Sequence, residues 1–303
     1  DNEFAVMEAD GISYTDAEGN PVEPKVMHVD WDVDVAEKGG YPDFMLKEIH
    51  EQPRVIRDTL AGRLTNGVLS IDELGMSLEQ LRLIDRVYII ACGTSYHAGL
   101  IARQLIEGWA RIPVEVEAAS EFRYRNPIIT PSTLVVAVSQ SGETADTLAA
   151  IRDARIKGAK VFGITNVIGS PVARESDGVI YTKANKEIAV ASTKSFLGQI
   201  VSLTLLAMVL AQAKGKLSIA QIRLLFKELA DTAEQVEEVL SDTKAIDIAA
   251  QACKDANDAL FIGRGMGAAI CYEGALKLKE ISYLHAEAYA AGEMKHGPIA
   301  LLS

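Results

Sequence analysis

Cysteine is scarce in this chain, and the few cysteines are widely spaced. The 303 residues include three of them, Cys92, Cys253 and Cys271. An odd number of distant thiols excludes a disulfide framework, and the absence of a C-x-x-C pair excludes a zinc site built on that spacing. We therefore expect a reducing, cytoplasmic compartment, no bound metal ion and no cofactor.

Basic residues are also few. Lysine and arginine together number 30 against 42 acidic residues, which gives a formal net charge of -12. Nucleic acids and anionic membranes bind positively charged surfaces, so we expect neither as a partner.

The sequence carries no recognisable signal peptide or membrane span. It begins with the polar residues Asp1-Asn2-Glu3, and no apolar segment follows them. The longest apolar stretch, Phe196–Ala213, is interrupted by glutamine, serine and threonine and predicts a buried core helix. An initiator methionine is absent and residues 297–303 predict the start of a further strand, so we expect the chain to be part of a longer protein.

What the chain does have is an alternation of short apolar runs with helix-forming segments. Runs rich in valine and isoleucine predict parallel strands that are buried on both faces. Strands that alternate with helices predict an α/β fold with a mostly parallel sheet and right-handed crossovers. The expected strands are Val87–Ala91, Val114–Val116, Leu134–Val138, Val161–Thr165 and Val179–Thr182.

This α/β pattern is flanked by other segments. Residues 1–30 alternate β-rich runs, Lys25–Val29 among them, with turn signals and predict hairpins. Asp43–Leu60 predicts helix with a break at Pro53, and Ser218–Ala256 predicts helix throughout. Leu260–Gly267 then repeats the pattern of Tyr88–Ser95, which indicates a second α/β copy that stops after one crossover.

The most informative segment is the loop Ser139-Gln140-Ser141-Gly142-Glu143-Thr144, which follows the strand Leu134–Val138 and precedes a helix from Ala145. Backbone N–H groups at such a junction attract an anion, above all a phosphate. Ser139, Ser141 and Thr144 add hydroxyl donors, whereas the loop has no lysine, arginine or Walker pattern. We therefore expect a phosphorylated small metabolite, with an ordinary capped helix as the alternative.

A second strand-to-helix junction has the same character. Cys92-Gly93-Thr94-Ser95 follows the first strand, and a helix is expected from Tyr96. Gly93 permits close backbone approach, while Thr94 and Ser95 supply hydroxyls, unless they only cap the helix. Cys92 has no evident base beside it, and we expect it to line the pocket rather than act as a nucleophile.

Candidate acid and base groups lie near the end of the chain. Glu273, Lys277 and Glu280 share one helix face, which suits either a site or a salt-bridged solvent face. The following segment 285–298 predicts an ordered functional loop in which a Gly-Pro turn supports His296 as an acid/base group. His285 has no such support and is expected to be structural. Gly265 and Gly267 are only half of a dinucleotide fingerprint, so NAD is not expected.

Together these motifs resemble those of the glutamine–fructose-6-phosphate aminotransferase (isomerising) family. The likeness runs from about Gly39 to Ser303, and residues 1–30 are similar to the end of that family's glutaminase domain. The Ser-x-Ser-Gly-Glu-Thr pattern alone marks the wider sugar isomerase (SIS) family. The segments that carry the resemblance are Cys92–Tyr96, Ser120–Arg125, Ser139–Thr147, Val190–Lys194 and Glu273–Tyr283.

The resemblance implies a domain plan. The fold would be a three-layer αβα sandwich of the SIS type, in one complete and one truncated copy. Residues 1–38 would be the tail of a glutaminase domain, 39–75 linker helices, 76–240 the first SIS domain and 241–303 the beginning of the second.

The resemblance also implies a reaction and its residues. Fructose 6-phosphate and glutamine-derived ammonia would give glucosamine 6-phosphate. Ser95, Ser139, Gln140, Ser141 and Thr144 would hold the phosphate, and Cys92, Gly93, Thr94, Val190 and Ser192 would line the sugar site. Glu280 would move a proton between C1 and C2, Lys277 would lie near the reacting oxygens, and His296 would assist ring opening in the neighbouring subunit of a homodimer.

The chain departs from the family in two ways, and alternative assignments remain for one residue and for the function. The family's catalytic cysteine and its Schiff-base lysine match no residue of this chain, so we expect sugar-phosphate binding with little product formation. Ser192 is alternatively a simple helix cap. A non-catalytic SIS regulator and a stand-alone phosphosugar isomerase remain alternative functions, although residues 1–30 argue against the latter.

Overall fold

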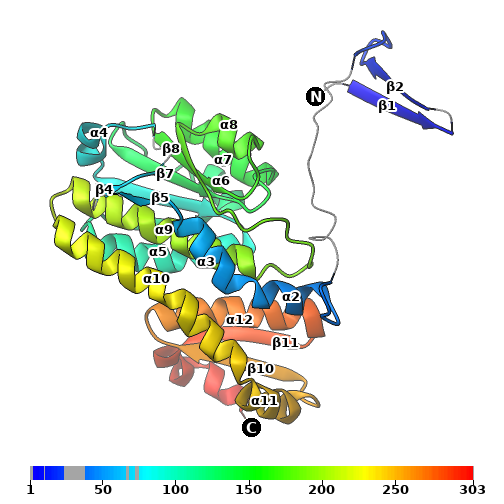
Figure 1. Ribbon diagram of the computed structural model, residues 1–303, viewed down its shortest axis with the longest axis vertical. Coiled ribbons are helices and arrows are strands. Elements are labelled where there is room, and N and C mark those ends of the chain that lie inside the picture. Colours follow the sequence, from blue (N-terminus) through cyan, green and yellow to red (C-terminus); the bar gives the residue numbers. More distant parts are fainter. Residues whose placement is uncertain (1–2, 10, 24–37, 66–67, 72–74, 303) are drawn as a thin grey trace. The chain divides into compact units, whose positions relative to one another are not determined.

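The computed structural model describes residues 3–9, 11–23, 38–65, 68–71 and 75–302. The chain forms two compact units, Asp1–Gly39 and Gly40–Ser303. In the first unit, strands β1 (Glu3–Glu8) and β2 (Gly11–Asp16) form an antiparallel hairpin (Figure 1). The carboxylate of Asp16 accepts N–H groups of Glu18 and Asn20 and closes the next turn. The β-rich run expected over Lys25–Val29 lies outside the described residues.

The second unit is built on a five-stranded sheet in the order β6-β5-β7-β8-β9, with every neighbouring pair parallel. The predicted α/β class and parallel sheet are therefore confirmed. The central strand β7 is buried at every position, as its unbroken apolar run predicts. The strands are β5 (Arg86–Ala91), β6 (Val114–Ala118), β7 (Thr133–Val138), β8 (Lys160–Thr165) and β9 (Gly178–Tyr181).

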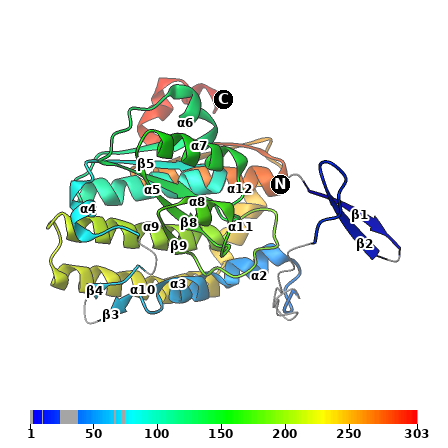
Figure 2. The ribbon, with the colours of Figure 1, turned by 90° about the horizontal axis from the view of Figure 1, so that it is seen from above.

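Helices cover both faces of this sheet and give three layers (Figure 2). Val87, Ile89 and Ala91 of β5 face one layer, whereas Tyr88 and Ile90 face the other, as the two-residue period of a strand requires. The first layer contains α5 (Gly93–Trp109) and α9 (Lys194–Ala213), and the second contains α6 (Ala119–Arg125), α7 (Ala145–Ile156) and α8 (Pro171–Glu175).

The apolar segment predicted as a core helix is α9. Among the described residues it is the helix long and apolar enough to cross a membrane, but 78% of that apolar window is buried inside the protein. One side of α9 packs toward the sheet through Leu203 and Leu206, and another contacts α3 and α10 through Val201 and Leu205. Burial against other helices accounts for its apolar composition.

The remaining predicted helices are present, but the helix expected throughout Ser218–Ala256 is interrupted at Asp242 and Thr243 and ends at Cys253. α2 (Phe44–His50) and α3 (Gln52–Leu60) are separated at Glu51, and Pro53 lies in the first turn of α3, where its missing N–H costs nothing. Two short strands and a short helix lead into the sheet, and two helices follow α9. They are β3 (Leu64–Thr65), β4 (Val68–Leu69), α4 (Leu78–Leu83), α10 (Ile219–Ser241) and α11 (Lys244–Cys253).

The second α/β copy consists of β10 (Asp258–Gly263), α12 (Met266–Ser282) and β11 (His285–Ala290), with β10 and β11 parallel. The single predicted crossover is thus confirmed. Ile262 of β10 is 54% exposed and Leu302 is 64% exposed, so this copy carries open apolar surface.

Two expectations at the end of the chain are wrong. The segment 285–298, predicted as a loop, begins with strand β11; alternating alanines have low strand propensity, and pairing with β10 supplies the backbone hydrogen bonds. The strand expected over residues 297–303 is instead the 3-10 helix η2 (Pro298–Leu301), which follows η1 (Ala291–His296). Pro298 favours a helical first turn because its φ is fixed.

Candidate functional site

The two predicted hydroxyl-rich loops lie side by side at the carboxyl edge of the sheet. The chain leaves β5 toward β6 on one side and later returns to β7 on the other, so the strand order reverses between β5 and β7. Ligands of parallel sheets bind in the crevice at such a reversal. Ala91 and Val138, the last residues of β5 and β7, are direct partners in the sheet register. The segments that follow them therefore start from neighbouring positions.

The loop after β7 is ordered by its own hydroxyl groups. The Oγ of buried Ser139 lies 2.9 Å from the Oγ1 of Thr144, and the N–H of Gly142 donates to Ser139 Oγ at 3.1 Å. The N–H of Glu143 donates to Ser141 Oγ at 3.2 Å. Thr144 is the N-cap residue of α7 but forms no side-chain capping bond. The hydroxyl groups of this loop therefore bond within the loop, and Thr144 does not cap α7 with its side chain.

Gly142 gives this loop its shape. Its φ of 68° lies in the left-handed region, which favours glycine. A Cβ at this position would lie 2.1 Å from the Oγ of Ser170 and 2.8 Å from the Oγ1 of Thr165. The carbonyl oxygen of Gln140 accepts the N–H of Asn166 at 3.0 Å. The loop is thus held against the end of β8.

The loop after β5 turns into helix earlier than predicted. α5 begins at Gly93 rather than Tyr96, so Thr94 and Ser95 lie in its first turn. Cys92 is the N-cap residue, is half-buried and makes no side-chain capping bond. Gly93 has a φ of 54°, again a conformation that favours glycine. Two helix N-termini, of α5 and α7, thus begin at the same sheet edge, where their partial positive charges favour an anion.

Helix α12 brings the predicted acid and base groups to this edge. Lys277 Nζ lies 3.0 Å from Thr94 Oγ1, 2.6 Å from Glu280 Oε2 and 3.4 Å from Glu273 Oε1. Thr94 Oγ1 lies 2.9 Å from Glu273 Oε1. The Glu273 and Lys277 side chains are 7% and 16% exposed, whereas that of Glu280 is 34% exposed, so the face is buried at Glu273 and opens to solvent at Glu280. The second α/β copy therefore completes a cluster that begins in the first.

His97 belongs to the same cluster and was missed in the sequence. Its Nδ1 lies 2.7 Å from Glu273 Oε2, and its ring stacks on that of Tyr272. A signal existed, because His97 follows Thr94 by three residues and must share its helix face.

The loop after β9 carries the other two predicted sugar contacts. Val190 is 95% exposed, and Ser192 donates its hydroxyl to Glu187 Oε2 at 2.9 Å. The alternative that Ser192 caps α9 is wrong, since Thr193 occupies the N-cap position. Instead Glu187 Oε1 accepts the N–H groups of Thr193 and Ser195 at 3.0 and 3.2 Å.

Two carboxylates that precede the sheet, Glu48 of α2 and Glu51 at its end, also hold this loop. The sequence did not predict these contacts. Glu48, 2% exposed, accepts the N–H of Ile188 at 2.6 Å. Burial raises the pKa of Glu48 above its ordinary value, and the N–H groups of Ile188 and Ala189 partly oppose that shift. Lys194, 1% exposed, contacts Glu51 Oε2 at 2.6 Å.

The structure does not join His296 to these groups. His296 is the last residue of η1 and is exposed, and the contacts of the described residues do not link it to Glu280 or Lys277. His285 pairs with Asp258 at 2.6 Å across β10 and β11, in line with its expected structural role. No group of histidine, cysteine and acidic residues suited to a metal ion occurs among the described residues.

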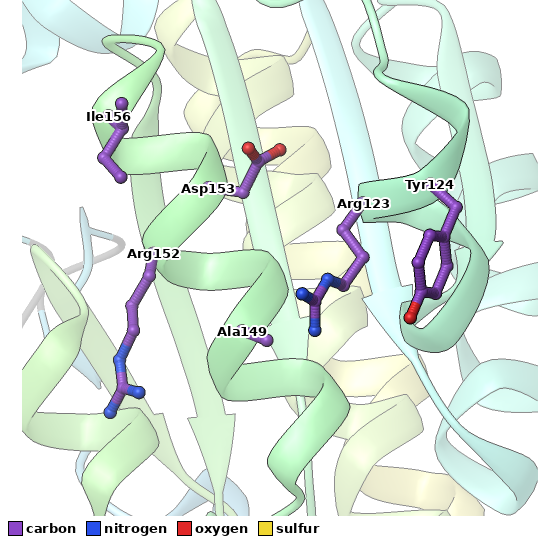
Figure 3. A pocket seen from close by; sticks show the side chains of 6 residues that line it. All are labelled: Arg123, Tyr124, Ala149, Arg152, Asp153 and Ile156. Carbon is purple, nitrogen blue, oxygen red and sulfur yellow. The ribbon is translucent and has the colours of Figure 1, made fainter.

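A hollow lies between α6 and α7, lined by Arg123, Tyr124, Ala149, Arg152, Asp153 and Ile156 (Figure 3). Two of its charged side chains already have partners, because Arg152 pairs with Glu175 at 2.6 Å and Asp153 pairs with Lys157 at 2.7 Å. It is lined by residues beyond the first turn of α7 and so lies away from the loop 139–144. We assign it no role in the site.

Comparison with known proteins identifies the family. The SIS domain family model matches residues 80–209 and 253–303. The chain belongs to the SIS domain family. The SIS match covers the sheet β5–β9 as well as the second copy, and it includes both hydroxyl-rich loops and the acid/base face of α12.

Individual relatives show where this chain belongs within the SIS family. The chain is 52% identical over 303 residues to a glutamine–fructose-6-phosphate aminotransferase [isomerizing] of Clostridium perfringens, covering all of this chain and 50% of that protein. It is similar to the solved C-terminal domain of glucosamine-fructose-6-phosphate aminotransferase from Francisella tularensis, at 43% identity and a TM-score of 0.84, over 88% of this chain and 75% of that one. A phosphosugar isomerase structure from Silicibacter pomeroyi matches at 28% identity and a TM-score of 0.70, over 86% and 75% of the two chains.

These matches confirm the resemblance predicted from the motifs. This SIS protein is a member of the glutamine–fructose-6-phosphate aminotransferase family, and its fold is that of the family's C-terminal domain. The chain spans about half the length, 50%, of the curated relatives it matches first.

Proposed function

We propose that this chain binds fructose 6-phosphate at the carboxyl ends of β5 and β7 and forms the isomerase part of an aminotransferase that makes glucosamine 6-phosphate. The observation that carries the proposal is the cluster of Lys277, Glu280 and Thr94 beside a loop of neutral hydroxyl donors. The loop suits a monophosphate, and the cluster suits a proton transfer between two carbon atoms of the sugar that carries this phosphate.

The phosphate is proposed to lie at the N-termini of α5 and α7. Ser95, Ser139, Gln140, Ser141 and Thr144 supply donors around that point, and the helix termini add partial positive charge. Because the donors are uncharged, the globally acidic protein attracts the ligand only at short range.

The sugar is proposed to extend from the phosphate toward α12. Cys92, Gly93 and Thr94 would line it from one side, and Val190 and Ser192 from the loop after β9. The two carboxylates that anchor this loop, buried Glu48 and half-buried Glu187, support its role, since they fix a segment whose tip, Val190, is open to solvent.

Glu280 is proposed as the base. In a ketose-to-aldose conversion a proton leaves C1 and is returned to C2, and a single carboxylate over both carbons can carry it. The ammonium group of Lys277 lies 2.6 Å from that carboxylate and is placed to stabilise negative charge on the substrate oxygens.

The wider assignment follows the relatives. We propose glutamine-derived ammonia as the nitrogen source, a cytoplasmic homodimer as the working form, and His296 as the group that opens the sugar ring in the neighbouring subunit's site. The exposure of His296 and its lack of a described link to Glu280 support a role outside its own subunit's cluster.

Binding measurements on the purified chain test the proposal. Fructose 6-phosphate should bind more tightly than inorganic phosphate in calorimetry, and the combined Ser139→Ala and Ser141→Ala changes should weaken both ligands by about tenfold or more. Ser132→Ala, which alters a serine at the amino end of β7, is the matched control and should change neither affinity. Equal affinity for the sugar phosphate and for phosphate would contradict the sugar site.

A non-catalytic regulator would bind the sugar in the same way. The two functions differ in D2O, where the isomerase should exchange hydrogen at C1 of fructose 6-phosphate and a regulator should not. The partly buried Lys277–Glu280 pair favours the enzyme, because binding alone has no need of a base held beside a cation.

A further inference from the structure

Among the described residues, Glu273 is the member of the proposed site to which the imidazole of His97 bonds. His97 Nδ1 lies 2.7 Å from Glu273 Oε2, and the ring stacks on Tyr272 with centroids 6.0 Å apart. The His97 side chain is 14% exposed. His97 lies on α5 and its two partners on α12, and these helices pack side by side (Figure 2). The contact therefore joins the two α/β copies directly behind the proposed sugar site.

Glu273 connects His97 to two residues of the proposed site. Its second oxygen, Oε1, lies 2.9 Å from Thr94 Oγ1 and 3.4 Å from Lys277 Nζ. Lys277 in turn contacts Glu280 at 2.6 Å. The result is one connected chain of polar groups that runs from His97 to the proposed base.

We infer that His97 is a positioning residue, which donates its Nδ1 hydrogen to Glu273 and thereby fixes the carboxylate that orients Thr94 and Lys277 toward the sugar. This inference rests on the proposed function. A carboxylate only accepts hydrogen bonds, so the ring nitrogen facing Glu273 must carry a hydrogen. Glu273 has little exposure to water, and an oxygen that lost the imidazole donor would have to turn away from Thr94 to find another.

Two substitutions separate the hydrogen-bond donor from the ring. His97→Asn keeps an N–H group close to the position of Nδ1 and removes the ring that stacks on Tyr272. His97→Phe keeps the ring and removes the donor. A role in packing alone predicts that His97→Phe is the milder change, whereas the positioning role predicts the opposite order.

The experiment measures the binding of fructose 6-phosphate and of inorganic phosphate to each purified variant by calorimetry. We expect His97→Phe to weaken fructose 6-phosphate about tenfold, the effect of losing one hydrogen bond to a charged group, and His97→Asn to stay within about threefold of the unchanged chain. Phosphate affinity should stay within about twofold in both, because the loop 139–144 does not contact His97; that result also shows that the variants are folded.

The possible failures are distinct. If the unchanged chain binds fructose 6-phosphate no better than phosphate, the proposed function fails. If it prefers the sugar phosphate but His97→Phe does so equally, or His97→Asn is the more damaging change, the positioning role fails.

A measurement on the unchanged chain covers the case in which a variant does not fold. The 15N spectrum of the histidine rings, with His97 assigned by its loss in His97→Asn or by through-bond correlation, reports which nitrogen carries hydrogen. Hydrogen on Nδ1 of His97 is expected, and a bare Nδ1 would overturn the inference.

Discussion

Thr94 and Lys277 are 183 residues apart in the sequence, yet the Oγ1 of the first lies 3.0 Å from the Nζ of the second. Thr94 opens α5 of the first α/β copy, and Lys277 lies on α12 of the second. The proposed site is therefore shared between the two copies. Removal of Lys277 from α12 should therefore impair ligand binding at loops that belong to the other copy.

Replacement of Lys277 tests this dependence. Lys277→Met removes the cation between Glu273 and Glu280 and leaves two carboxylates close together, one of them buried. We expect a loss of about 1–3 kcal/mol in the free energy of unfolding and a fall of about tenfold or more in affinity for fructose 6-phosphate. Urea denaturation and calorimetry measure the two effects. Lys279→Met, at an exposed position on the same helix, should change neither.

Gly142 provides a test of the phosphate loop. In Gly142→Ala the new Cβ would collide with the Ser170 side chain at 2.1 Å, and the φ of 68° strains any residue other than glycine. We expect about 1–3 kcal/mol of lost stability together with weaker phosphate binding. Gly158→Ala is a matched control, since its φ is 90° but nothing lies within 4 Å of the added Cβ. That variant should lose stability and keep its phosphate affinity, and a loss of phosphate binding there would argue against a local effect at Gly142.

Glu280→Gln separates binding from chemistry. The amide keeps the size of the side chain but cannot take a proton, so hydrogen exchange at C1 of fructose 6-phosphate in D2O should fall by at least about 100-fold. The dissociation constant should change by less than about threefold, because the phosphate contacts are untouched. Proton NMR follows the exchange. Exchange at the original rate would mean that another group is the base.

Glu48 predicts a pH dependence of stability. Burial raises the pKa of Glu48 in the folded protein. Its favourable contribution to the free energy of unfolding is therefore complete below the unfolded pKa of 4.5 and is lost as the pH rises through the folded pKa. Glutamine does not titrate, so Glu48→Gln does not lose this contribution as the pH rises. The unfolding free energy of the variant relative to the unchanged chain should therefore increase between about pH 4 and pH 7 in urea titrations.

Glu237 provides a control because its pKa shift has the opposite sign to that of Glu48. Its hydrogen bond from Arg57 lowers the pKa, so its contribution is present above the unfolded value of 4.5 and is lost as the pH falls. Glu237→Gln should therefore show the reverse trend, and a weaker one because this pair is exposed. Parallel trends in the two variants would contradict the assigned cause of the Glu48 shift.

The sheet could be predicted from the sequence because each strand carries its own signal. The valine run of β7 has no stable position except one buried on both faces, and the hydroxyls that follow must then lie at the sheet edge. The alanine-rich β11 carries no comparable signal, since pairing with β10 alone makes it a strand.

Contacts that depend on the positions of individual side chains were the ones that sequence reasoning missed. Ser192 has the composition of a helix cap, and only the position of the Glu187 side chain shows that it is not one. Similarly, the partner of His97 lies 176 residues away on another element. Local propensity fixes helices and strands, but it holds no information on which side chains meet across the two copies.

The division of the site between α5 and α12 also has a consequence for its assembly during synthesis. The loop 139–144 and its sheet neighbours emerge from the ribosome first, and Lys277 follows roughly 130 residues later, which takes about 7–26 s at ~5–20 residues per second. The first copy has its own buried core and does not wait for α12 to form one. Once α9, which belongs to that core, has emerged, the proposed phosphate loops can thus be in place before the proposed base Glu280 joins them.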